Sequence, residues 1–164
     1  MARKPAPLGF KVIVDSREQQ PLNFTAEDME TAALKTGDYT IKGLEHVLCV
    51  ERKGSLTELY GNIFDERFER ELVRMQEFPE KYIVLEFPFS QILGFPHSTN
   101  IPRKKFRYIK CRPDTIIRRI TEIQTTYGVQ FVFCDSKNGA YRYVRSLLKR
   151  VYEKYKETIQ PGTD

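Results

Sequence analysis

The stretch Lys35–Leu59, KTGDYTIKGLEHVLCVERKGSLTEL, contains two short apolar runs and the start of a helix. The runs Tyr39–Ile41 and Val47–Val50 have the length and the β-branched content of strands. The polar segment 42–46 between them contains a glycine, which favours a turn. The stretch therefore predicts a β-hairpin that runs directly into a helix.

Charged residues lie at the end of this hairpin opposite the turn. Asp38 precedes the first strand, and Glu51, Arg52 and Lys53 follow the second. Because side chains alternate along a strand, Glu51 and Lys53 should share one face and Arg52 should lie on the other. The hairpin thus predicts two acids and a lysine within reach of one point.

A helix is expected to begin directly behind this point. Ser55 and Glu58 have the spacing of a capping box, in which their side chains satisfy free backbone amides. The helix would bring its positive dipole end close to Glu51 and Lys53.

The remaining chain alternates strands and helices. A first strand, Lys11–Val14, ends at Asp15, and a polar loop follows it. A helix is predicted by an apolar stripe of Phe64, Phe68, Leu72 and Met75. The same helix has a second, charged stripe of Arg67, Arg70, Glu71 and Arg74. Later elements are expected at 82–85 (strand), 113–127 (helix), 129–134 (strand) and 138–156 (helix). This order predicts one α/β domain over residues 1–164 with a mixed central sheet, flexible only at 1–9 and 158–164.

Bulk properties limit the classes of function. The formal charge of +5 and the pI of about 9.1 favour a polyanionic partner. Three widely spaced cysteines include Cys49 and Cys134 in apolar runs, which favours buried thiols over disulfides or a zinc site. The N-terminus lacks the apolar core of a signal peptide, and no apolar stretch is long enough to span a bilayer. An intracellular protein without membrane contact is expected.

The paired acids and the lysine suit metal-assisted hydrolysis of a phosphodiester. Asp38 and Glu51 offer the oxygen ligands that Mg²⁺ or Mn²⁺ prefers. A metal ion would offset charge on the phosphate and lower the pKa of a bound water. Lys53 could orient that water or stabilise the developing charge. Asp15 and Glu18 supply two further carboxylates at the end of the first strand.

The segments VDSRE (14–18), GDY (37–39) and VERKGSLTEL (50–59) resemble the nuclease domain of the XPF-type structure-specific endonucleases, a branch of the PD-(D/E)xK superfamily. The resemblance implies a restriction-endonuclease-like three-layer sandwich with a mixed sheet flanked by helices. It implies that Asp38, Glu51 and Asp15 bind metal. The implied catalytic residues are Lys53, Glu51, Asp38, Asp15 and Glu18, and the implied DNA contacts are Arg17, Arg52 and Arg67.

Two departures from the family pattern stand out. Thr57 occupies the position of the last aspartate of the motif, and Glu58 is rotated from it by about 100° on a helix. The paired helix-hairpin-helix modules that usually follow this domain are not present in the 164 residues. The resemblance further implies action on branched or flap DNA, in repair or recombination, and a homodimer.

A basic segment, 103–112, lies in the least regular part of the chain and contains Phe106 and Tyr108. It either contacts DNA, by gripping the backbone or stacking a displaced base, or is a solvated loop. The candidate contacts within it are Arg103, Lys104, Lys105 and Arg107. Two alternatives to a DNA endonuclease stay open: a non-catalytic DNA-binding or scaffold domain, and a nuclease acting on RNA.

Overall fold

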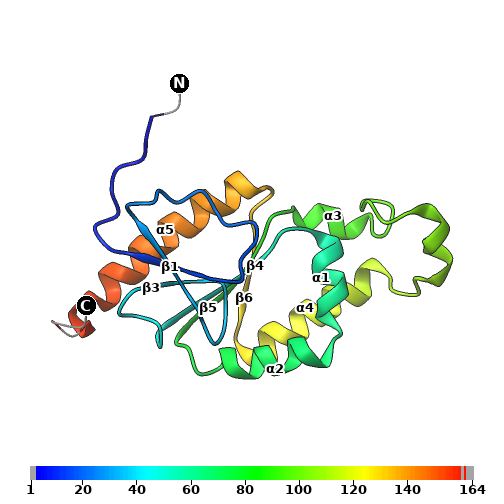
Figure 1. Ribbon diagram of the computed structural model, residues 1–164. Coiled ribbons are helices and arrows are strands. Elements are labelled where there is room, and N and C mark those ends of the chain that lie inside the picture. Colours follow the sequence, from blue (N-terminus) through cyan, green and yellow to red (C-terminus); the bar gives the residue numbers. More distant parts are fainter. Residues whose placement is uncertain (1–2, 160, 162–164) are drawn as a thin grey trace.

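A six-stranded mixed sheet forms the centre of the protein. The computed structural model describes residues 3–159 and 161, and its elements are shown in Figure 1. The expectation of flexibility at residues 1–2, 160 and 162–164 lies outside the described residues. The strands, in spatial order, are β2 (Met29–Ala32), β1 (Val12–Asp15), β3 (Tyr39–Ile41), β4 (Leu48–Lys53), β5 (Glu80–Leu85) and β6 (Gln130–Phe133).

Both parallel and antiparallel pairs occur in this sheet. β3 runs antiparallel to its neighbours β1 and β4, which confirms the expected hairpin. β1 and β2 are parallel, as are β4, β5 and β6. The carboxyl ends of β1 and β4 therefore lie close to the amino end of β3.

Helices cover both faces of the sheet, which confirms the three-layer sandwich. The helices are α1 (Leu56–Ile63), α2 (Glu66–Met75), α3 (Phe89–Leu93), α4 (Pro113–Tyr127) and α5 (Lys137–Tyr155), with 3₁₀ turns η1 (Arg103–Tyr108) and η2 (Lys156–Thr158). The long helix α5 lies on one face, and α1, α2 and α4 lie on the other (Figure 1). Gly128 ends α4 in the left-handed conformation, as its position after the apolar stripe predicts.

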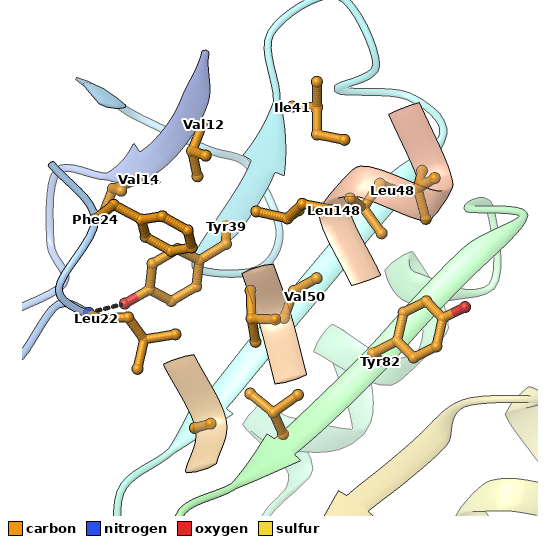
Figure 2. Close-up of a cluster of buried hydrophobic side chains, with 14 of the residues drawn as sticks. Val12, Val14, Leu22, Phe24, Tyr39, Ile41, Leu48, Val50, Tyr82 and Leu148 are labelled. Carbon is orange, nitrogen blue, oxygen red and sulfur yellow. Dashed lines mark hydrogen bonds between the residues drawn. The ribbon is translucent and has the colours of Figure 1, made fainter. Parts of the chain in front are cut away.

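The two faces of the sheet bury separate cores. Between the sheet and α5, Tyr39 is fully buried, and its hydroxyl accepts a hydrogen bond from the amide of Leu22 at 2.8 Å (Figure 2). Val50 and Leu48 of β4 face this core, whereas Cys49 faces the core beneath α1, α2 and α4. Cys134, like Cys49, is buried as expected. The alternation along β4 thus follows the prediction.

Two local expectations were wrong. The segment expected to be a polar loop contains β2, an edge strand whose side chains are half-buried or exposed. Phe64 is 50% exposed and ends α1, so it does not belong to the apolar stripe of the next helix. The Asp65 side chain accepts a hydrogen bond from the amide of Arg67 and thereby begins α2 as a separate helix.

None of the helices in the described residues has the length and apolar character required to cross a bilayer.

Candidate active site

Backbone hydrogen bonds bring the ends of three strands together. The amide of Asp15 donates to the carbonyl of Asp38, and the amide of Asp38 donates to the carbonyl of Val50, both at 2.8 Å. The amide of Arg52 donates to Oδ2 of Asp38, also at 2.8 Å. These bonds place the carboxylate of Asp38 between the end of β1 and the end of β4.

Gly37 allows this close approach. Its φ is +83°, in the left-handed region that side chains other than glycine rarely adopt. A Cβ at this position would lie 2.7 Å from Sγ of Cys49 and 3.2 Å from the carbonyl oxygen of Val50. Only glycine lets the chain pass against β4 immediately before Asp38.

An open cleft of about 360 Å³ lies over these strand ends. Its base is formed by buried or half-buried residues of the sheet and by Phe68 of α2, and its rim by exposed cations and polar residues of α1, α2 and the loops after β1 and before β3. The lining residues are Asp15, Arg17, Lys35, Gly37, Asp38, Glu51, Lys53, Asn62, Asp65, Arg67, Phe68, Glu71 and Arg74.

Asp38 and Glu51 are crowded carboxylates at the base of the cleft. Glu51 is only 7% exposed. Burial raises the pKa of Glu51 well above its ordinary value, and the negative charges of Asp38 and Glu71 raise it further. Burial also raises the pKa of Asp38 to about 6, although the amide of Arg52 acts in the opposite direction. A cation placed between them would therefore be strongly favoured.

Lys53 projects to the same face as Glu51, as predicted, and is 6% exposed. Its Nζ lies 3.4 Å from Oε1 of Glu51 and donates to Oδ1 of Asn62 at 3.0 Å. The ring of Phe68 lies under the ammonium group, with its centroid 5.2 Å from Nζ. Packing on three sides thus fixes the position of the ammonium group in the cleft.

Asp15 lies beside this pair and is oriented by two other groups. Its Oδ1 accepts a hydrogen bond from the amide of Leu34 at 2.9 Å, and its Oδ2 accepts one from Nε of Arg17 at 3.0 Å. Burial acts to raise the pKa of Asp15, but the bonds from Leu34 and Arg17 outweigh it, so the pKa lies below its ordinary value. Asp15 is accordingly a fixed anion at the edge of the cleft.

Arg52 and Glu18 lie apart from the lysine, on the other side of the sheet. Nη2 and Nε of Arg52 donate to the two oxygens of Glu18 at 2.7 and 2.9 Å, and Nη1 donates to Glu86 at 2.9 Å. Arg52 is 8% exposed. Its guanidinium therefore connects the loop after β1 to the end of β5, and Arg52 and Glu18 both line a second cleft beside the first.

A second cleft, of about 330 Å³, adjoins the first. The two share Asp15, Arg17, Asp38 and Glu51, so these residues separate two openings. Glu58 lines the second cleft, and its Oε2 accepts a hydrogen bond from the amide of Gly54 at 2.8 Å.

The helix start has the expected cap. Oγ of Ser55 accepts a hydrogen bond from the amide of Glu58. Oγ1 of Thr57 lies 3.4 Å from Oδ1 of Asn100, and Thr57 lines neither cleft.

The other predicted DNA contacts fall into two groups. Arg17 and Arg67 line the rim of the first cleft. Arg103, Lys104, Lys105 and Arg107 are exposed on η1, in a segment that projects beyond α1 and α4 (Figure 1).

Several residues of the cleft were not singled out as site residues from the sequence. The polar stripe along α2 did contain a signal, because its members Glu71 and Arg74 line the cleft together with Arg67. Lys35 and Asn62 had no recognisable signal.

The donor set at the base of the cleft fits a hard divalent cation. Among the described residues, no three His, Cys, Asp or Glu side chains are spaced as ligands of one ion. Mg²⁺, however, commonly keeps several waters and takes only one or two protein carboxylates. Asp38 and Glu51 meet that requirement. Burial first, and then the charges of neighbouring carboxylates, raise the pKa of each carboxyl group, and a bound cation would stabilise both groups as anions.

Comparison with known proteins shows the family and the fold. A family model described as the ERCC4 domain matches residues 14–147. Two solved structures share the fold: XPF from Aeropyrum pernix (TM-score 0.66, 20% identity, 90% of this chain and 68% of that one) and XPF from the same organism in complex with DNA (TM-score 0.62, 22% identity, 88% and 66%). The chain thus spans about two thirds of these XPF chains. No curated protein sequence matches it.

Proposed function

This chain belongs to the ERCC4 domain family as an XPF-type nuclease domain, and we propose that it is a divalent-metal-dependent DNA endonuclease that hydrolyses phosphodiester bonds. The single observation that carries the proposal is the convergence of Asp38, Glu51 and Lys53 in one open cleft. Each of these side chains is held by a defined partner rather than exposed on a loop.

Two carboxylates would hold the metal ion. Asp38 and Glu51 are the proposed ligands, and Asp15 is a further carboxylate at the same edge. Bound Mg²⁺ or Mn²⁺ would supply Lewis-acid stabilisation of the phosphate and a water of lowered pKa.

Lys53 would act directly on the reacting groups. Its ammonium group is held by Asn62 and Glu51 and faces the cleft, so it can orient the attacking water or offset charge on a phosphate oxygen. Glu18 was expected to be catalytic, but its two oxygens bind Arg52. Glu18 also lines the second cleft with Asp38 and Glu51, so we keep it as an active-site carboxylate whose position Arg52 fixes.

Exposed cations around the cleft would bind the DNA backbone. Arg17, Lys35, Arg67 and Arg74 line the rim. They can neutralise phosphates on either side of the scissile bond, which positions the strand without reading its sequence. A branched or flap-containing DNA and a homodimer are proposed from the family resemblance, and light scattering would test the homodimer.

A cleavage panel tests the proposed function. Wild type and the variants Asp38→Asn, Glu51→Gln and Lys53→Ala would be incubated with linear duplex, flap and four-way junction DNA in Mg²⁺ or Mn²⁺. We expect metal-dependent nicking by the wild type alone, with a branched DNA cleaved fastest. An RNA flap in the same panel tests the choice of nucleic acid.

A non-catalytic DNA-binding or scaffold domain is the competing function. Thr57, at the position of the family's last aspartate, favours that alternative. Binding of the same DNAs without cleavage in either metal would support it and would refute the endonuclease.

A further inference from the structure

The positive charge of the chain is concentrated in one segment. Residues 87–113 contain none of the 22 acidic residues but six of the 27 Lys and Arg residues. The rest of the chain therefore carries 21 basic residues against 22 acidic ones. All six cations lie within residues 98–112, which we call the basic arm: Arg103, Lys104, Lys105, Arg107, Lys110 and Arg112.

The basic arm projects from the body of the protein beside α1 and α4 (Figure 1). Its 3₁₀ turn η1 has no buried residue. Among the described residues, none of the six cations forms an ion pair with a carboxylate. The charge of the basic arm is thus available to an external polyanion.

Contacts along the basic arm hold it in place. Asn100 lies 3.4 Å from Thr57 in the first turn of α1. The rings of His97 and Phe106 meet edge to face at a centroid distance of 4.8 Å. Oγ of Ser98 donates to the carbonyl of Gln91 at 2.6 Å. A ligand would therefore meet a preformed surface, which reduces the entropy lost on binding.

Tyr108 is the most exposed large hydrophobic side chain in the described residues, at 71%. The guanidinium of Arg107 lies over its ring, 5.0 Å from the centroid. An exposed aromatic ring among cations is the combination that binds unpaired nucleic acid, because phosphates contact the cations while a base stacks on the ring. A duplex would use the cations alone, since its bases are already stacked on one another.

We propose that the basic arm binds a single-stranded segment of DNA and stacks an unpaired base on Tyr108. The basic arm touches α1, which begins three residues after Lys53, so the strand would be held close to the cleft. This inference rests on the proposed function and assigns the unpaired strand of the proposed DNA substrate to the basic arm, with Tyr108 as the stacking residue.

Binding without metal tests the inference separately from cleavage. Fluorescence anisotropy in EDTA would compare a labelled oligothymidylate with a labelled blunt duplex. The variants are Tyr108→Ala, Tyr108→Phe, which keeps the ring, and Phe64→Ala, which removes an exposed ring outside the basic arm. We expect Tyr108→Ala to weaken oligothymidylate binding by at least about fivefold, the lower end for one stacked base, with duplex binding unchanged. Tyr108→Phe and Phe64→Ala should bind both DNAs like the wild type.

Either of two results would overturn the inference: unchanged oligothymidylate affinity in Tyr108→Ala, or an equal loss for both DNAs. Because no metal is present, these results do not depend on catalysis. A different outcome concerns only the proposed endonuclease: the wild-type protein nicks no DNA in Mg²⁺ or Mn²⁺, although Tyr108→Ala still weakens oligothymidylate binding. That result would refute the endonuclease and leave the inference about the basic arm intact.

Discussion

Glu51 combines a strongly raised pKa, caused first by burial, with a central place in the proposed chemistry. It is almost fully buried, and Asp38 and Glu71 add like charges beside it. Lys53, at 3.4 Å, is the cation that pairs with it. An anion in such surroundings destabilises the folded state unless a further cation is bound.

Removing that charge should stabilise the metal-free protein. We expect Glu51→Gln to raise the melting temperature in EDTA by at least about 2 °C, because a gain of about 1 kcal/mol raises it by about 2–4 °C in a domain of this size. The same variant should be inactive in nicking assays. Differential scanning calorimetry measures the first effect, with the exposed Glu77→Gln as a control that should not change. A lower melting temperature for Glu51→Gln would contradict the account.

At the scale of single residues, the sequence predicts the direction of side chains on a strand but not the direction of side chains on packed helices. The side-chain alternation of β4 was enough to place Glu51 and Lys53 together and Arg52 apart. Asn62 and Glu71 belong to helices, and their direction depends on how α1 and α2 rotate against the sheet. That rotation follows from the packing of the whole core, which spacing along the chain does not determine.

Among the elements, β4 is the one that links the site to the rest of the fold. Its odd and even residues serve two faces: Glu51 and Lys53 line the first cleft, while Arg52 binds Glu18 and Glu86 and lines the second cleft. Arg52 therefore connects the loop after β1 and the end of β5 to β4. The middle residue of the ERK motif therefore supports the site from within the domain.

Truncating Arg52 should be strongly destabilising. Arg52→Ala would leave Glu18 and Glu86 as buried carboxylates without their partner, which typically costs about 3–5 kcal/mol. Urea unfolding measures this change. Arg70→Ala, an exposed arginine on α2 that does not line the cleft, should change stability by less than about 0.5 kcal/mol. Equal stability of the two variants would contradict the assignment.

The Glu18–Arg52 pair should also make stability depend on acidity. Burial acts to raise the pKa of Glu18, but the hydrogen bond from Arg52 outweighs it and lowers the pKa below 4.5. A lowered pKa contributes stability that is present above the unfolded pKa and is lost as pH falls through the folded pKa. The stability difference between wild type and Glu18→Gln should therefore shrink as pH falls below about 4.5. A constant difference between neutral pH and pH 3 would exclude this linkage.

Most elements could be predicted because their apolar spacing was regular. The helices α4 and α5 and the strands β1, β3, β4, β5 and β6 were all expected near their observed bounds. β2 (Met29–Ala32) was missed because an edge strand needs few apolar residues, and its pairing with β1 comes from distant backbone contacts. The start of α2 was placed too early, at Phe64 instead of Glu66, because Phe64 continued the apolar spacing although it is 50% exposed.

The excess positive charge of the whole molecule is concentrated beside the cleft and is not spread evenly over the surface. The basic arm holds six cations, and the exposed face of α5 holds others, including Arg142 and Arg150. If both regions contacted DNA equally, charge removal at either would weaken binding alike. Because the basic arm lies next to α1, we expect that its cations contact phosphates and that those of α5 do not.

The salt dependence of binding separates these possibilities. For a branched DNA in EDTA, Lys104→Ala/Lys105→Ala should reduce the slope of log affinity against log salt concentration by about 0.9 for each phosphate that is no longer neutralised, hence by about 1.8 for the pair. Arg142→Ala/Arg150→Ala removes the same charge from α5 and should leave the slope unchanged. Equal slopes for the two double variants would show that the basic arm has no special part in binding.

The most direct test of the hydrolytic cleft is the single-turnover cleavage rate of Lys53→Ala on a flap DNA in Mg²⁺. The measurement uses saturating protein, so that weaker binding does not lower the rate, and Arg70→Ala serves as the matched control. The account predicts a rate at least about 100-fold below the wild type, as for the loss of one transition-state donor, with a normal rate for Arg70→Ala. A wild-type rate for a folded Lys53→Ala protein would contradict it.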